Sequence, residues 1–169
     1  MKKNLTDLKE VSAASHRLQY AALPWRWNNE LEVMLVSSRE TRRWVVPKGW
    51  PMRHRKPHDA AAQEALEEAG LVGHIAKKAL GTFKYEKRMR NGAILPCKVD
   101  VFPMHVVRQR KTWREFHERT TRWFSIPDAV AAVREPDLKE LILRLSTIAP
   151  ANRKPVPAAP PAISSGPVL

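Results

Sequence analysis

The sequence predicts an α/β sandwich, in which a mixed and curled sheet lies between two helices. Residues 57–69 are strong helix formers that follow a Gly/Pro-rich basic loop. Residues 31–36 and 94–107 are rich in the apolar residues of strands. Residues 136–146 carry apolar residues at the i, i+3, i+4, i+7 spacing of a helix face that packs on a sheet. This stripe consists of Leu138, Leu141, Ile142 and Leu145.

The length of 169 residues suits one domain with two tails. We place the domain at residues 17–148, after a flexible polar arm at residues 1–16. Residues 149–169 are rich in proline and alanine and have little to bury, so we expect a disordered tail there. No pattern in the sequence indicates an oligomeric state.

The formal net charge is +13, although the helix at 57–69 is locally acidic, so the positive excess lies around that helix. This charge favours polyanionic partners: phosphate-rich small molecules, nucleic acid or an anionic membrane surface. The single Cys97 excludes an internal disulfide and a Cys-rich zinc site, and we expect it to be buried. Because the sequence has no run long enough to span a membrane and no signal peptide, we predict a cytoplasmic protein.

Three strands are expected before the helix. Pro24 favours an edge or a bulge in the first strand, because proline cannot donate to a strand ladder. Asn28-Asn29 marks the turn to the second strand, whose apolar density predicts burial on both faces. The third strand delivers the chain to Pro47-Lys48-Gly49. The expected strands span residues 18–27, 31–36 and 44–46.

The chain after the helix is expected to form a hairpin. Residues 71–86 are typical of a strand with a break at Gly81, and Asn91-Gly92 is a strong turn signal at the hairpin tip. The prolines of the return strand, Pro96 and Pro103, suggest edges or bulges. The segments that follow are a basic loop or short helix at 108–122 and a last strand that leads into a helix at 123–129.

The helix at 57–69 presents three carboxylates. Glu64, Glu67 and Glu68 stand at i, i+3 and i+4, so their Cβ atoms lie about 5–6 Å apart on one face. Such anions repel one another. They therefore extend into water as a solvated acidic face, or a cation holds them together, and oxygen ligands of this kind suit Mg²⁺ or Mn²⁺.

The stretch GWPMRHRKPHDAAAQEALEEAGL, from Gly49 to Leu71, resembles the Nudix box. That box consists of a glycine, five residues, a glutamate, seven residues, Arg-Glu, an aliphatic residue, any residue, Glu-Glu, any residue, a glycine and an aliphatic residue. The matching positions are Gly49, Glu64, Glu67, Glu68, Gly70 and Leu71, with Ala65 as a small apolar stand-in. Over about residues 17–146 the sequence is therefore identified as a member of the Nudix superfamily, whose fold is the predicted sandwich.

Two positions depart from the box, because Arg55 replaces its first glutamate and Gln63 replaces its arginine. In the family these two residues contact each other and the catalytic carboxylates. Since both have changed together, neither leaves a charge without its partner, and the exchange can be nearly neutral. Gln63 can still hydrogen-bond Glu64 but carries no charge, so we expect slower turnover with metal binding kept.

The resemblance implies hydrolysis of a phosphoanhydride with a divalent metal ion, Mg²⁺ or alternatively Mn²⁺. It implies that Glu64 and Glu68 bind the metal and that Glu67 is the catalytic base. Glu67 also belongs to the implied metal-binding set, together with Gly49 and the backbone carbonyl of Lys48. In some enzymes of the family a further acidic residue assists as a ligand or base, and the candidates for it are Glu115 and Glu118. For Glu118 the alternative is a simple ion pair with Arg119 or Arg122.

Other segments narrow the resemblance to the diphosphoinositol polyphosphate phosphohydrolase branch. They are AAL-P-WR, the strand that ends in Val36-Ser37-Ser38, and the run from Arg43 to Pro47. Enzymes of that branch cleave inositol pyrophosphates, and several also cleave dinucleoside polyphosphates. Pro-Lys-Gly at 47–49 occurs instead in dinucleoside tetraphosphate hydrolases, so both substrate classes stay open. The implied substrate-binding residues, for which a solvated surface is the competing interpretation, are Arg17, Ser38, Arg39, Lys48, Arg88 and Arg90.

Two other functions fit parts of the sequence. An RNA 5′-end pyrophosphohydrolase or an RNA-binding protein fits the positive charge, and it predicts a steep linear dependence of log affinity on log salt. A non-catalytic Nudix module that binds a phosphorylated ligand as a regulator fits Arg55 and Gln63. The presence of all three glutamates argues against the second alternative.

Overall fold

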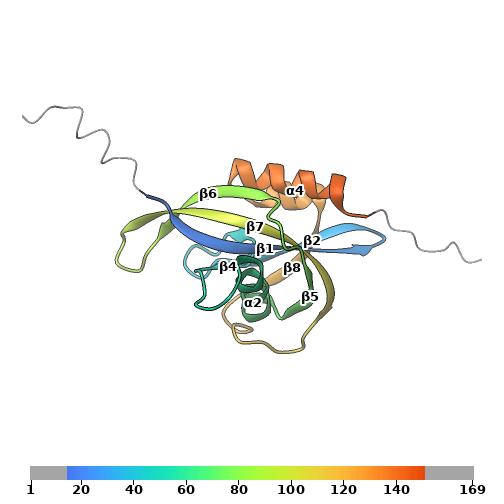
Figure 1. The fold of residues 1–169 in the computed structure, drawn as a ribbon, viewed down its shortest axis with the longest axis horizontal. Coiled ribbons are helices and arrows are strands. Elements are labelled where there is room, and N and C mark those ends of the chain that lie inside the picture. The colour runs from blue at the N-terminus through green and yellow to red at the C-terminus, as the bar shows by residue number, and fades with distance from the viewer. Residues whose placement is uncertain (1–14, 151–169) are drawn as a thin grey trace, which may run out of the picture.

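The computed structural model describes residues 15–150. An eight-stranded mixed sheet lies between α2 (Pro57–Ala69) on one face and α4 (Pro136–Ile148) on the other, with the short α3 (Ile126–Ala132) packed beside α4 (Figure 1). The predicted α/β sandwich is confirmed. Most of the predicted arm and tail, residues 1–14 and 151–169, lies outside the described residues.

The strands follow the chain in the predicted order, with additions. They are β1 (Arg17–Asn28), β2 (Glu30–Ser37), β3 (Trp44–Val45), β4 (Lys48–Gly49), β5 (Leu71–Ile75), β6 (Gly81–Arg88), β7 (Ile94–Gln109) and β8 (Thr121–Ser125). The main order across the sheet is β3-β2-β1-β7-β5, and β4, β6 and β8 pair with β1, β7 and β2 respectively.

The long strands β1 and β7 form the centre of the sheet as a parallel pair, which runs from Arg17 opposite Cys97 to Trp25 opposite His105. On the side away from β7, β1 pairs first with β4 and then with β2. On the side away from β1, β7 pairs first with β6 and then with β5. Each central strand therefore changes partner partway along its length, which gives the sheet its curl.

The strand prolines lie near these changes of partner. Pro24 lies in an interior strand, so the expectation of an edge or bulge is wrong for it. The N–H of Ala22 donates to the Pro47 carbonyl at 3.1 Å. Backbone nitrogens two residues apart in a strand point toward the same neighbouring strand. The nitrogen of Pro24 therefore faces the gap between the β4 and β2 partners, where its missing hydrogen breaks no ladder bond. Pro103 lies in the equivalent gap between the β6 and β5 partners of β7, whereas Pro96 precedes the stretch that pairs with β1.

The segments that flank β7 differ in part from the prediction. The predicted strand at 71–86 is two strands, separated by residues 76–80, and the second begins at the predicted break. Residues 110–120 form turns without a helix, so the loop alternative is the correct one. This β7–β8 loop is joined to the end of α2, because the N–H of Arg110 donates to the Gly70 carbonyl at 2.8 Å and that of Glu115 to the Glu67 carbonyl at 3.0 Å.

The two long helices bury different kinds of surface. α4 buries the predicted stripe of leucines and isoleucine, whereas α2 buries alanines. Glu68 follows Ala61 and Ala65 along the same buried face of α2, so its carboxylate is carried toward the sheet. Cys97 is buried as predicted. None of the helices between residues 15 and 150 is long and apolar enough to cross a membrane.

Candidate active site

The C-terminal end of α2 is fixed by a glycine and by the β7–β8 loop. Gly70 has the left-handed φ of 67°, and its N–H donates to the Leu66 carbonyl at 3.0 Å. Trp113 packs over it so closely that a Cβ on Gly70 would lie 2.4 Å from the indole. The indole N–H of Trp113 also donates to the Glu68 carbonyl at 3.1 Å. This end of the helix, which carries Glu67 and Glu68, is therefore held in one position.

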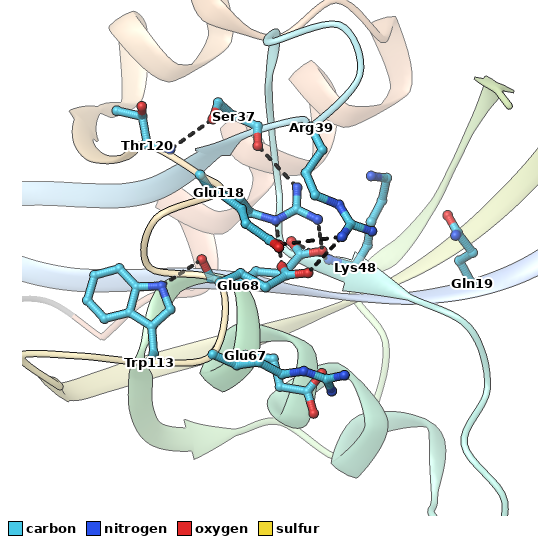
Figure 2. A network of polar contacts seen from close by, with 12 residues as sticks. Gln19, Ser37, Arg39, Lys48, Glu67, Glu68, Trp113, Glu118 and Thr120 are labelled. Carbon is cyan, nitrogen blue, oxygen red and sulfur yellow. Dashed lines mark hydrogen bonds and ion pairs between the residues drawn. The ribbon is translucent and has the colours of Figure 1, made fainter. Parts of the chain in front are cut away.

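Glu68 is the most buried of the three box carboxylates, with 4% of its surface exposed. Its carboxylate pairs with the Arg119 guanidinium at 2.9 Å and accepts from the Lys48 backbone N–H at 3.4 Å. Burial raises the pKa of Glu68 to about 7, while the positive charges of Lys48 and Arg119 oppose that rise. Glu68 lies within the network of Figure 2, whereas Glu67 lies apart from Arg39 and Glu118.

Glu64 lies against the backbone of β4. A Cβ on Gly49 would lie 2.0 Å from its Oε1, so the missing side chain at Gly49 makes room for this carboxylate. Burial raises the pKa of Glu64 to about 7, and repulsion by Glu67 and Glu115 adds to the rise. Gly49 is therefore needed at this position for space, and its part in binding a metal stays a prediction.

Glu67 projects from the same end of α2 and is held by two other side chains. Gln63 donates to one carboxylate oxygen at 2.9 Å, and Arg114 approaches the other at 3.2 Å. The expectation that Gln63 bonds Glu64 is wrong, because residues four apart lie one above the other on a helix and neighbours do not. Arg114 comes from the β7–β8 loop and supplies a positive charge beside Glu67. The Nudix box has an arginine at position 63, where this chain has the uncharged Gln63.

Arg119 is the residue of this site that the sequence did not reveal. Its guanidinium contacts Glu68, the Glu115 carboxylate at 2.7 Å and the Ser37 carbonyl at 3.1 Å, with 8% of the side chain exposed. It thus joins α2, the β7–β8 loop and the end of β2. The signal in the sequence was weak: Arg119 stands four residues after Glu115, in a stretch with many other arginines.

Lys48 and Arg39 bring positive charge to the carboxylates. The Lys48 ammonium lies 5.0 Å from the centre of the Tyr85 ring, and burial lowers its pKa to about 8 against the opposing charge of Glu68. Arg39 pairs with Glu115 at 3.4 Å and with Glu118 at 3.5 Å (Figure 2). Glu118 thus pairs with Arg39, and the expected pairing with Arg119 or Arg122 is wrong.

The other predicted substrate-binding residues lie in different surroundings. The Ser38 hydroxyl contacts Thr41 at 2.7 Å and accepts from the Arg43 N–H at 3.2 Å, so it closes its own turn. Arg17 lies 5.4 Å from the centre of the Trp50 ring, and Arg90 pairs with Glu40 at 3.6 Å. Within residues 15–150 no ion pair joins Arg17 or Arg88 to the box carboxylates, and their roles stay predictions.

The donor chemistry of the site fits a hard divalent cation. The three box carboxylates and Glu115 offer only oxygen ligands. Burial raises the pKa of Glu64 and Glu68 and repulsion between the carboxylates adds to the rise, and a cation would relieve both. As the side chains stand, no three acidic, histidine or cysteine residues in the described part of the chain form a metal-holding group. Arg119 pairs with both Glu68 and Glu115, so its guanidinium supplies the positive charge beside these two carboxylates.

The raised pKa values predict a pH-dependent stability of the metal-free protein. The carboxyls of Glu64 and Glu68 have a pKa of about 7 in the fold, above their ordinary value of 4.5. Between these values the folded protein binds more protons than the unfolded chain, so their contribution to the free energy of unfolding decreases as pH rises. With a chelator present, we expect a melting temperature that falls between about pH 5 and about pH 7, with a smaller fall in Glu64→Gln/Glu68→Gln. Equal falls in both proteins contradict the prediction.

Comparison of the sequence with known proteins finds relatives in one family. No family model matches the sequence. The chain is 28% identical over 141 residues to Nudix hydrolase 16, mitochondrial, of Arabidopsis thaliana, covering 75% of this chain and 78% of the relative. It is 32% identical to Nudix hydrolase 18, mitochondrial, of the same plant, covering 72% and 69%. It is also 32% identical to the mouse diphosphoinositol polyphosphate phosphohydrolase 3-alpha, covering 68% and 67%.

Solved structures share the fold. A C. elegans Ap4A hydrolase superposes with a TM-score of 0.57 at 16% identity, covering 78% of this chain and 97% of that protein. The NUDIX domain of Shewanella oneidensis NrtR, solved with ADP ribose, superposes with a TM-score of 0.57 at 14% identity, covering 84% and 98%. At these identities the likeness concerns the fold alone.

Proposed function

Given that the chain belongs to the Nudix hydrolase superfamily and is a Nudix pyrophosphohydrolase, we propose that it hydrolyses a diphosphoinositol polyphosphate or a dinucleoside polyphosphate with Mg²⁺, or alternatively Mn²⁺. The observation that carries this proposal is the group of carboxylates at the end of α2, with the buried Glu68 at its centre and Lys48 and Arg39 nearby. The name of the mouse relative and that of the C. elegans hydrolase each contain one of the two substrate classes. A cytoplasmic location stays a prediction, and the names of two plant relatives place them in mitochondria.

The cation would be held by the carboxylates of Glu64, Glu68 and Glu67, with Gly49 and the Lys48 backbone carbonyl in the same set. When bound, it supplies Lewis-acid polarisation of the phosphoryl group and neutralises negative charge. The Lys48 ammonium adds a further positive charge near Glu68. Its lowered pKa of about 8 leaves the ammonium largely protonated at neutral pH.

Glu67 is the proposed proton acceptor. It takes a proton from the attacking water, whose oxygen forms the new bond to phosphorus as the bridging P–O bond breaks. Gln63 and Arg114 each hold one of its carboxylate oxygens, so its orientation is set before substrate arrives. Glu115, which Arg119 positions beside Glu68, is the alternative acceptor.

The phosphates that do not react are expected to bind Lys48 and Arg39. Replacing either residue by Ala should therefore raise KM more for a highly phosphorylated substrate than for a nucleoside diphosphate sugar. Each lost contact should cost about 1.5–3 kcal/mol, the range for hydrogen bonds to charged groups. Steady-state kinetics on both substrates measure the difference, with the exposed Arg134→Ala as the control. Equal rises for both classes would show that these residues do not recognise phosphate density.

The substrate class is tested by a turnover panel. Wild-type protein is assayed with Mg²⁺ and with Mn²⁺ on inositol pyrophosphates, dinucleoside polyphosphates, nucleoside diphosphate sugars and 5′-triphosphate RNA. We expect the highest kcat/KM on one of the first two. Preferential cleavage of the RNA would replace this proposal by the RNA 5′-end activity that the net charge of +13 also suits. In that case log affinity should fall linearly with log salt, and more steeply for longer RNA.

A further inference from the structure

A cavity lies beside α2, on a different side of the helix from Glu64 and Glu68. Its volume is about 680 Å³, within the range of small-molecule sites. Asp59, Ala62, Gln63 and Leu66 of α2 line it, at the i, i+3, i+4, i+7 spacing of one helix face. Neither Glu64 nor Glu68 lines this cavity.

The cavity is rich in unpaired positive charge. Arg53 and Arg55 from the loop before α2 line it, together with Arg110 from the β7–β8 loop. No ion pair within residues 15–150 involves these three arginines. Asp59 is the one carboxylate in the lining, and it contacts the His58 imidazole at 3.4 Å. An anion entering the cavity therefore meets arginines that have no competing protein partner.

The inner wall of the cavity is apolar. Leu66 and Val72 line it and are partly exposed, whereas Leu71 and Met104, which also belong to the lining, are almost fully buried. Gly73 of β5 adds backbone to the lining, and no side chain fits there because a Cβ would lie 2.0 Å from the His105 carbonyl of the neighbouring β7. A ligand that fills the cavity needs a charged end for the arginines and an apolar, preferably flat, body for this wall.

The two departures from the Nudix box both lie in this cavity. Arg55 and Gln63 line it, although no hydrogen bond joins them to each other. Compared with the box glutamate, Arg55 replaces a negative charge by a positive one, which makes the cavity more favourable for a phosphate. Gln63 also donates to Glu67 at 2.9 Å, so one side chain belongs to the cavity wall and to the support of the proposed base.

We infer that this cavity binds a small phosphate monoester with a flat apolar group, and that this site is separate from the site of hydrolysis. The phosphate contacts Arg53, Arg55 and Arg110, and the flat group packs on Leu66 and Val72. Such a ligand carries no phosphoanhydride, so the protein binds it without consuming it. A ligand in the cavity contacts Gln63, which in turn donates to Glu67 of the proposed hydrolytic site.

The test measures binding of adenosine 5′-monophosphate to the full-length protein by isothermal titration calorimetry in the presence of a chelator. We expect one molecule bound per chain. Adenosine and inorganic phosphate should each bind at least about tenfold more weakly, because each lacks one half of the ligand. Arg53→Ala/Arg55→Ala should weaken binding at least about tenfold, and Ala62→Trp, which places a bulky side chain in the cavity wall, should weaken it at least as much.

Two controls keep the outcome interpretable. Lys84→Ala/Arg134→Ala removes two exposed positive charges outside the cavity and should leave binding unchanged. Glu64→Gln/Glu68→Gln should also bind normally, which separates this site from the proposed active site. Circular dichroism confirms that each variant is folded. The inference is overturned if the wild type shows no saturable binding, or if the ligand binds equally well to the arginine double variant and to Ala62→Trp.

Discussion

Glu67→Gln is expected to lower kcat by about 10²–10⁴-fold, the scale of a lost general base, while the fold stays intact. The substitution keeps the shape of the side chain and an oxygen that can accept from Gln63. Glu67 is 23% exposed and makes no core contact of the kind that Glu68 makes, so little stability should be lost. Single-turnover kinetics at saturating Mg²⁺, beside a thermal melt, measure both effects.

The neighbouring carboxylates provide the comparison for this variant. Glu64→Gln and Glu68→Gln should instead raise the Mg²⁺ concentration that half-maximal activity requires, because they remove proposed ligands. If Glu67→Gln keeps activity within a few-fold of the wild type, the base lies elsewhere. Glu115 is then the first residue to replace, since it lies beside Glu68, and Glu118 is the second.

Arg119→Ala is expected to lower the free energy of unfolding by about 3–5 kcal/mol, as for other buried ion pairs that lose one partner. Glu68 and Glu115 both lose their nearest positive charge, and the Ser37 carbonyl loses a donor. The cost is large because the guanidinium is 8% exposed, so water cannot replace it without rearrangement. Urea denaturation at neutral pH measures the change.

The matched control is Arg114→Ala, because it removes an arginine of the same loop from the same helix. The Arg114 side chain is 74% exposed, and an exposed ion pair is worth about 0–1 kcal/mol. Adding Glu115→Gln to Arg119→Ala should recover part of the lost stability, since one stranded charge disappears. Equal costs for Arg119→Ala and Arg114→Ala would contradict the structural role given to Arg119.

Local signals predicted the helix that carries the chemistry. Pro57 and Gly70 set both ends of α2 correctly, because the first-turn preference of proline and the left-handed glycine depend on neighbouring residues only. The i, i+3, i+4 spacing likewise placed Glu64, Glu67 and Glu68 together on one helix. The apolar stripe of α4 was equally local, although the helix continues two residues beyond the predicted end at Ser146.

Contacts between distant segments could not be predicted in the same way. Arg119 and Glu68 are 51 positions apart in the sequence. Several other arginines lie close to Arg119 in the chain, and no local signal distinguishes it from them. Pro24 was misjudged because the change of partner from β4 to β2 depends on pairing with strands that follow later. The cavity beside α2 was also invisible, since it needs the loop before α2, β5 and the end of β7 together.

The most direct test of the central claim, that the α2 carboxylates hydrolyse a phosphoanhydride with a divalent cation, is a Mg²⁺ titration of turnover on diadenosine tetraphosphate and a diphosphoinositol polyphosphate. Wild type and Glu64→Gln/Glu68→Gln are compared. We predict turnover of at least one substrate by the wild type that rises with Mg²⁺ and ceases with a chelator, and a titration shifted to much higher Mg²⁺ in the double variant. Turnover that survives the chelator, or the same titration in both proteins, would contradict the account.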